Sequence, residues 1–213
     1  MSACPPARLS GCDDGGVADE AVERPEASEL FVPLLPVLAM LALMWGAEVV
    51  DTALGGDLDR FGIRPRQLDG LEGIVLAPLL HSGFGHLIAN SLPVLLMGVA
   101  ICLSGARRFV HVTFIVGLIA GVGTWLAGST GSLHIGASGL VFGYLTYLVS
   151  RGMFDHRIGY LVGGLITLFV YGGVLWGLVP RPGVSWQGHL FGALGGVVAA
   201  GALHAPRPEE ELL

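Results

Sequence analysis

Residues 109–150 read FVHVTFIVGLIAGVGTWLAGSTGSLHIGASGLVFGYLTYLVS and contain no acidic or basic side chain. A helix needs about 20 mostly apolar residues to cross the hydrocarbon core of a bilayer. The stretch is long enough for two such helices, and its polar segment STGSLH (129–134) is suited to the loop between them. It therefore predicts a pair of membrane-spanning helices.

Further uncharged runs lie on both sides of this stretch, at residues 30–47, 73–106 and 158–180. Of the 213 residues, 53% are hydrophobic and 13% are charged, whereas soluble domains carry about 25% charged residues. The composition excludes an ordinary soluble domain and predicts an all-α membrane protein, a six-helix transmembrane bundle over residues 30–204. We expect its spans at 31–50, 84–104, 109–128, 136–150, 158–178 and 187–204.

The net charge of −6 comes mainly from the two tails. Seven acidic residues lie in residues 1–29 and three in residues 205–213, of 17 in the chain. Such segments have too little apolar surface to offset the entropy of ordering, so we predict disordered tails. The sequence has no basic patch of the kind that would indicate a nucleic-acid partner.

Arginines in the short loops predict the orientation of the bundle. Arg107 and Arg108 follow the second span, and Arg151 and Arg157 flank the loop between the fourth and fifth spans. Cytoplasmic loops are enriched in basic residues, so these loops and both tails are predicted to be cytoplasmic. The second, fourth and sixth helices then start at the outer face.

Polar residues cluster at those three helix starts: His86 and Asn90 on the second span, Ser138 on the fourth, His189 on the sixth. Polar and ionisable groups within a membrane usually face the bundle interior or a water-filled cavity. A serine becomes a nucleophile when a histidine takes its proton. We therefore expect Ser138 as nucleophile and His189 as base, in a pocket open to the outside.

Glycines on the two helices favour their close approach. Gly139 and Gly143 on the fourth span, like Gly192 and Gly196 on the sixth, are four residues apart, a spacing that lets membrane helices pack closely. Gly136, ahead of the serine, would leave room for a neighbouring backbone.

Acyl transfer also needs donors for the developing oxyanion. The candidates are the Ser138 N–H at a helix N-terminus and the side chains of His86 and Asn90, which share one helix face. No acid is obviously placed to orient His189, although Glu48, Asp51 and Asp155 lie within or next to the spans. A dyad is thus favoured over a triad, with Phe142 stacking on the imidazole.

Simpler interpretations exist for each feature alone. A GxSG tetrapeptide is weak evidence in a chain with 34 glycines, and a membrane histidine often serves helix packing. We take His111, His134, His156 and His204 as loop or interface residues. Metal-ligand motifs are absent from the sequence, so no cofactor or metal is expected. A channel or transporter would favour inverted repeats or midplane charges, and we find neither.

Three motifs in order, HSGFGHLIAN (81–90), GASG (136–139) and HLFGALGG (189–196), resemble those of rhomboid intramembrane serine proteases. The resemblance covers about residues 30–204. It implies a rhomboid-like six-helix bundle whose Ser138–His189 dyad cuts single-span transmembrane proteins within the lipid bilayer, with His86, Asn90 and the Ser138 amide as the oxyanion hole. The alternative is a catalytically inactive relative that binds membrane helices. The number of subunits is not specified.

The first loop departs from the family pattern, because GIRPRQLDGL (62–71) stands where many members have a Trp-Arg pair. Arg64 or Arg66 is a candidate for that interfacial role. Residues 51–83 alternate apolar and charged side chains, which predicts an element partly inserted in the outer leaflet. His81 is expected to hold water or to brace this loop. A second departure is Phe142, where family members often have tyrosine.

The resemblance further implies a lateral gate for the substrate, made of the fifth span and the loop VPRPGVSWQG (179–188). Trp186 would then anchor this loop at the membrane interface. The alternative is that the loop is an ordinary connector between two helices.

Overall fold

A computed structural model describes residues 32–204, so the acidic tails and their predicted disorder lie outside the described residues. Within 32–204 the regular structure is helical, apart from an isolated bridge between Ile63 and His134. The long helices are α2 (Leu35–Ala53), α4 (Phe84–Cys102), α5 (Ala106–Ala127), α6 (Ser138–Asp155), α7 (Ile158–Tyr171) and α8 (Trp186–Ala202). The short helices are η1 (Val32–Leu34), η2 (Asp57–Phe61), η3 (Leu68–Gly70), α3 (Gly73–Leu76), η4 (Ala77–Leu79) and η5 (Gly172–Leu178).

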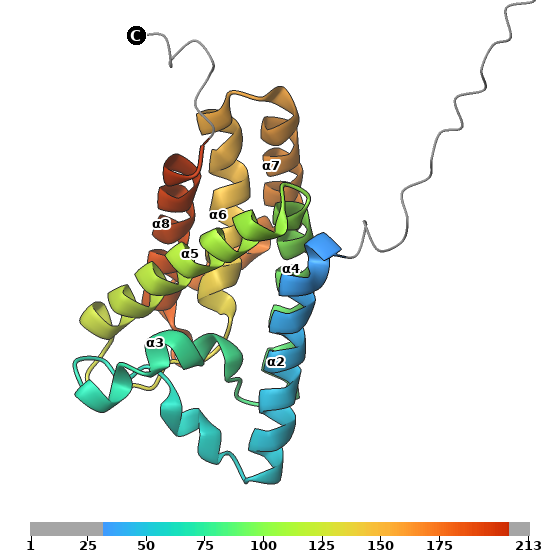
Figure 1. The fold of residues 1–213 in the computed structure, drawn as a ribbon. Coiled ribbons are helices and arrows are strands. Elements are labelled where there is room, and N and C mark those ends of the chain that lie inside the picture. Colours follow the sequence, from blue (N-terminus) through green and yellow to red (C-terminus); the bar gives the residue numbers. More distant parts are fainter. Residues whose placement is uncertain (1–31, 205–213) are drawn as a thin grey trace, which may run out of the picture.

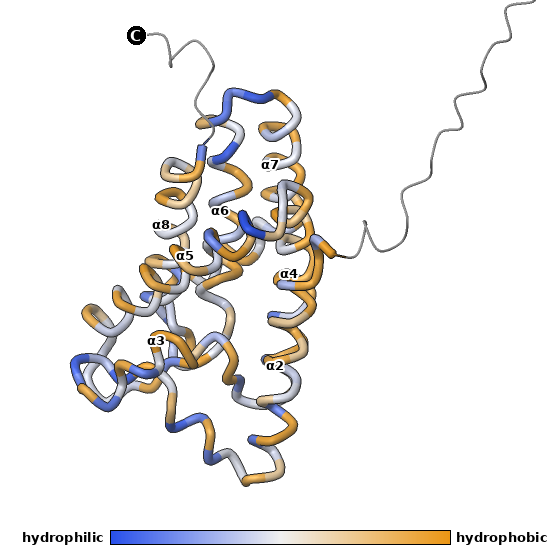
Figure 2. Tube along the Cα trace, in the orientation of Figure 1, coloured by the Kyte–Doolittle hydropathy of each residue, from blue (hydrophilic) through white to orange (hydrophobic). Residues whose placement is uncertain are grey.

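Four helices are long and apolar enough to cross a membrane: Val32–Ala53, Phe84–Cys102, Ala106–Ala127 and Ile158–Leu178. The apolar colouring along these segments is visible in Figure 2. The other two predicted spans, α6 and α8, do not meet that measure of length and hydropathy. Helix α6 has many buried residues and contacts α4, α5, α7 and α8, so neighbouring helices rather than lipid cover much of its surface (Figure 1).

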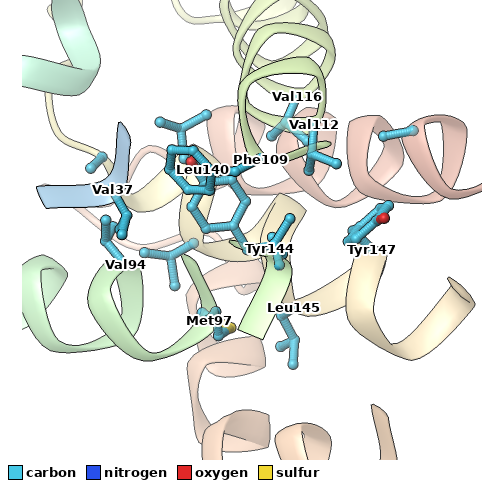
Figure 3. Packing of buried hydrophobic residues seen from close by; sticks show 14 of the residues in the cluster. Val37, Val94, Met97, Phe109, Val112, Val116, Leu140, Tyr144, Leu145 and Tyr147 are labelled. Atoms are coloured by element: carbon cyan, nitrogen blue, oxygen red, sulfur yellow. The ribbon is translucent and has the colours of Figure 1, made fainter. Parts of the chain in front are cut away.

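The buried core surrounds α6. Tyr144 and Tyr147 of α6 are fully buried, and the ring of Tyr144 lies beside that of Phe109 on α5, with centroids 5.7 Å apart (Figure 3). The Tyr144 hydroxyl is 2.7 Å from the Thr113 hydroxyl, so this buried polar group has a partner. A helix packed on several sides in this way can hold a reactive group at its end in a fixed position.

Helices α6 and α8 approach each other through glycines, as the four-residue spacings predict. A Cβ atom on Gly192 would collide with the backbone of Gly139, and one on Gly196 would collide with the Gly143 carbonyl. The Thr146 hydroxyl donates across the interface to the Ala193 carbonyl at 2.7 Å. Backbone contact is possible here only because these positions lack side chains.

The fourth predicted span, 136–150, is wrong at its C-terminal end, because α6 continues to Asp155. Arg151 is only 6% exposed and forms an ion pair with Asp155 at 3.0 Å, one helical turn ahead. Its guanidinium lies 3.7 Å from the ring centroid of Tyr160 and donates to the Ser104 hydroxyl at 2.6 Å. These contacts neutralise and cover the charge, so the chain stays helical where charge alone suggested a loop.

The first loop folds back across the end of the bundle that carries the α6 N-terminus (Figure 1). Arg66 donates to the Leu126 carbonyl at 2.9 Å and to the Thr130 hydroxyl at 2.6 Å, which ties the loop to the end of α5. Arg64 instead pairs with Asp69 of its own loop at 2.7 Å. Of the two candidate arginines, Arg66 is therefore the one that fastens the loop to the helices.

Candidate functional site

Ser138 and His189 lie within hydrogen-bonding distance, although 51 positions separate them in the sequence. Ser138 is the first residue of α6, and its Oγ is 2.9 Å from His189 Nε2 in the first turn of α8. The glycine contacts between the two helices bring their N-terminal ends together. His189 is 8% exposed, so the pair is shielded from bulk solvent on most sides.

The contact made by His189 Nδ1 shows which nitrogen of the imidazole carries the proton. His189 Nδ1 is 2.8 Å from the Gly177 carbonyl of η5. A carbonyl can only accept, so Nδ1 carries the proton and Nε2 is left as an acceptor for the Ser138 hydroxyl. This tautomer is the one that a general base needs.

Phe142, one turn after Ser138, holds the imidazole from its face. The two rings are parallel within 7° with centroids 4.3 Å apart, as the sequence predicts. The acids considered for orienting His189 are engaged or placed elsewhere. Asp51 accepts the Leu58 N–H at 2.7 Å, Asp155 pairs with Arg151, and Glu48 is buried in α2. The Gly177 carbonyl occupies the hydrogen-bonding position at His189 Nδ1 that an acid takes in a triad. The sequence does not predict this contact, because every residue has a backbone carbonyl.

The loop before Ser138 is fixed on the first loop by backbone bonds. Gly136 has φ +110° and donates its N–H to the Ala77 carbonyl at 2.8 Å. A Cβ atom at this position would lie 2.6 Å from the His86 ring. Glycine is thus required both by the backbone angle and by the close approach of His86.

His81 braces this same loop. Its Nε2 accepts the Ala137 N–H at 3.4 Å, and its Nδ1 lies 3.3 Å from the Leu79 carbonyl. Burial, with the neighbouring His86 as a second cause, lowers the pKa of His81 to about 4. The ring is therefore neutral near pH 7, as an acceptor for the Ala137 amide must be. These contacts join His81, in the first loop, to the loop that leads to Ser138.

The oxyanion candidates converge on the same end of the bundle. The His86 ring packs against Gly136, two residues before Ser138. Asn90 is buried one turn further along α4, and its Nδ2 donates to the His86 carbonyl at 3.1 Å. The Ser138 N–H stands at the N-terminus of α6, where amides lack intrahelical acceptors.

A cavity of about 40 Å³ adjoins Ser138. Small residues form much of its wall, including Ala120, Gly121, Gly139 and Gly188. A space of this size holds one or two water molecules or a small side chain. Within residues 32–204 no group of histidine, cysteine or acidic side chains is arranged to hold a metal ion.

A comparison with known protein families identifies a related domain. A family model described as the Rhomboid domain matches residues 69–206. The match includes the segments that carry all four of the polar residues predicted to meet at the helix starts.

Similar curated proteins occur in mycobacteria and in Bacillus. An uncharacterized protein of Mycobacterium tuberculosis is 47% identical over 186 residues, which cover 83% of this chain and 78% of that protein. An uncharacterized protein of Mycobacterium leprae is 45% identical over 186 residues, covering 83% and 74%. A Bacillus subtilis protein named "Putative rhomboid protease YdcA" is 31% identical over 193 residues, covering 81% and 91%.

Proposed function

Since the chain belongs to the rhomboid family of membrane proteins, we propose that it is an intramembrane serine endopeptidase. Its substrates are single-span membrane proteins, cut in or near the transmembrane segment. The observation that carries the proposal is the 2.9 Å contact between Ser138 Oγ and His189 Nε2, with Nδ1 fixed by the Gly177 carbonyl.

The chemistry follows from this tautomer. His189 Nε2 takes the Ser138 proton as Oγ attacks the scissile carbonyl, and the resulting imidazolium gives the proton to the leaving amine. The products of this first half of the reaction are an acyl-serine and a new amino terminus. Water then attacks the ester with its proton passing to Nε2, and Ser138 regains a proton as the new carboxyl terminus leaves.

The negative charge on the carbonyl oxygen needs donors during both attacks. We assign the Ser138 amide, His86 and Asn90 to this role. Two observations support the assignment: the His86 ring packs against Gly136, and α6 begins at Ser138. Gly139, Gly192 and Gly196 serve the reaction indirectly, by bringing α6 and α8 together.

The proposal includes a placement in the bacterial plasma membrane with six spans. Helices α6 and α8 cross with the four longer apolar helices, and the first loop lies partly in the outer leaflet. Arg151 and Ser104 meet at the end of the bundle where α4 and α6 finish. By the basic-residue rule this end is cytoplasmic, so Ser138 faces the outside and both tails lie in the cytoplasm.

The direct test is cleavage of a panel of single-span membrane proteins by the purified chain in detergent, with the cut sites located by mass spectrometry. A fluorophosphonate probe, mapped by peptide sequencing, should label Ser138 and no other serine. Labelling elsewhere, or the absence of any cut across the panel, would refute the protease assignment. Capture of the panel proteins without cleavage would support the inactive helix-binding alternative.

Gly177 offers a sharper test of the tautomer argument. We expect Gly177→Ala to lower the rate of probe labelling at least about tenfold, because the added Cβ would lie 2.9 Å from both His189 Nδ1 and Phe142 Cζ. The imidazole must then move from its bond with the carbonyl. Gly173→Ala in the same 3₁₀ helix is the control, since its Cβ would meet no atom within 4 Å. Equal labelling of the two variants would contradict the role of this carbonyl.

A further inference from the structure

A second histidine–serine contact lies beside the dyad and plays no part in the mechanism above. His134 Nδ1 is 2.7 Å from Ser185 Oγ, and His134 Nε2 is 2.7 Å from Ser132 Oγ. The backbone of His134 also pairs with Ile63 of the first loop, through bonds of 2.9 and 3.0 Å. The residue is 9% exposed, so these bonds are made largely out of water.

The direction of the hydrogen bonds can be worked out from Ser132. Its hydroxyl donates to the Ser129 carbonyl at 2.6 Å and has no second proton to give. Ser132 Oγ must therefore accept from His134 Nε2–H. In the neutral ring, which burial favours by lowering the pKa of His134, Nδ1 is then bare. Nδ1 therefore accepts a hydrogen bond from the Ser185 hydroxyl.

The position of the two partners links this bond to the dyad. His134 stands four residues before Ser138, and Ser185 stands four residues before His189. Ser185 precedes α8, and its carbonyl accepts the His189 N–H at 3.1 Å, which closes the first turn of the helix. Serine before a helix usually caps the free amides of its own first turn. Here the side chain makes no such cap, and its hydroxyl points to His134 instead.

The glycine contacts between α6 and α8 restrain the orientation of the two helices only weakly, and the His134–Ser185 bond adds to that restraint. The contacts between α6 and α8 near the site are made by glycine backbones. Such smooth surfaces hold two helices close but do little to fix their rotation or their sliding. A short directional hydrogen bond adds such a restraint near the helix starts, as the Thr146–Ala193 bond does further along the interface. His134 and Ser185 also line the cavity beside Ser138.

We propose that His134 and Ser185 form a positioning pair, which sets the start of α8 against the loop that leads to Ser138. The pair thereby brings the imidazole and the hydroxyl to bonding distance. This inference rests on the proposed protease function.

The test uses the full chain in detergent, with Ser185→Ala, His134→Ala and the double variant. The readouts are the second-order rate of Ser138 labelling by a fluorophosphonate, the kcat and KM for a single-span substrate, and the midpoint of thermal unfolding. For Ser185→Ala we expect about a tenfold lower labelling rate and kcat with KM within about twofold. The midpoint should fall by only about 2–4 °C, as for one lost hydrogen bond.

The double variant separates a pair that acts as one unit from two independent structural contacts. If the pair acts as one unit, the double variant should be labelled no more slowly than His134→Ala alone, because the first substitution has already removed the hydrogen bond. Ser129→Ala is the matched control, because alanine keeps the carbonyl that Ser132 uses, and it should match the wild type.

Two results would overturn the pair: a Ser185→Ala labelling rate within twofold of the wild type, or losses that multiply in the double variant. Ser185→Ala removes one hydroxyl and keeps the test decisive even where His134→Ala fails to fold. Labelling of the wild-type protein is measured in the same series. A wild type that labels normally beside an unaffected Ser185→Ala would thus reject the pair and leave the protease function standing.

Discussion

Replacing Ser138 or His189 with alanine is expected to lower the rate of substrate cleavage by at least about 10³-fold while the protein stays folded. Ser138→Ala removes the atom that attacks the carbonyl. His189→Ala leaves that atom without a base, since Asp51 and Asp155 are engaged in other contacts and Glu48 is buried in α2. The two losses should not multiply in the double variant, because nucleophile and base act as one unit. Cleavage of a labelled single-span substrate followed by gel electrophoresis measures all three.

The matched control for the base is His111→Ala, because His111 is an exposed histidine on α5. We expect it to cleave at the wild-type rate and to unfold at the wild-type temperature. A His189→Ala variant that retained a tenth of the activity would show that another group takes the serine proton. Loss of activity together with loss of the folded state would count against a purely chemical role for His189.

The parts of the site that could be predicted from sequence share one property. Ser138, His189, His86 and Asn90 are polar residues at the starts of helices that run in one direction, so topology alone brings them to one depth. Glycine spacing then predicts which two helices touch. The stacking of Phe142 on His189 can also be predicted, because its position one turn from Ser138 places it on the side of the helix that faces the base.

Other features depend on atoms or directions that residue types do not reveal. Gly177 acts through its backbone carbonyl, and any residue has one. The sequence predicts only a loop position for His134, since no pattern indicates that its side chain faces Ser185. Arg151 suggested a loop because an unpaired charge breaks an apolar run. Its ion pair with Asp155 and its contact with Tyr160 become visible only once the helices are packed.

The contrast between the dyad and its glycine support has a mechanistic meaning. The reactive groups make one hydrogen bond of 2.9 Å, which alone is too weak to hold two helices together. The position of that bond therefore depends on the close approach of the two helices below it, in addition to the proposed His134–Ser185 pair. Changes at those contacts should act on stability and on catalysis together, whereas changes at the dyad should act on catalysis alone.

The double substitution Gly192→Ala and Gly196→Ala should show this coupling, by lowering the midpoint of thermal unfolding by roughly 10 °C and by abolishing most cleavage. The new Cβ atoms would collide with the Gly139 and Gly143 backbones, and Gly196 would also meet the Thr146 hydroxyl. A backbone cannot rotate away as a side chain can, so α8 must move off α6 and carry His189 with it. Circular dichroism against temperature and the substrate assay measure the two effects.

Gly201→Ala tests whether the effect belongs to the contact rather than to glycine itself. Gly201 lies on the same helix, but its added Cβ would lie 3.5 Å from the Phe154 ring, an ordinary packing distance. Alanine is favoured over glycine within helices by roughly 0.5–1 kcal/mol, so this variant should unfold at or slightly above the wild-type temperature. If Gly201→Ala lost as much stability as the double substitution, or if the double substitution kept full activity, the close approach of α6 and α8 would not be what positions the dyad. A fall in stability and activity at residues 192 and 196 alone would instead identify the glycine contacts as the support on which the 2.9 Å bond between hydroxyl and imidazole depends.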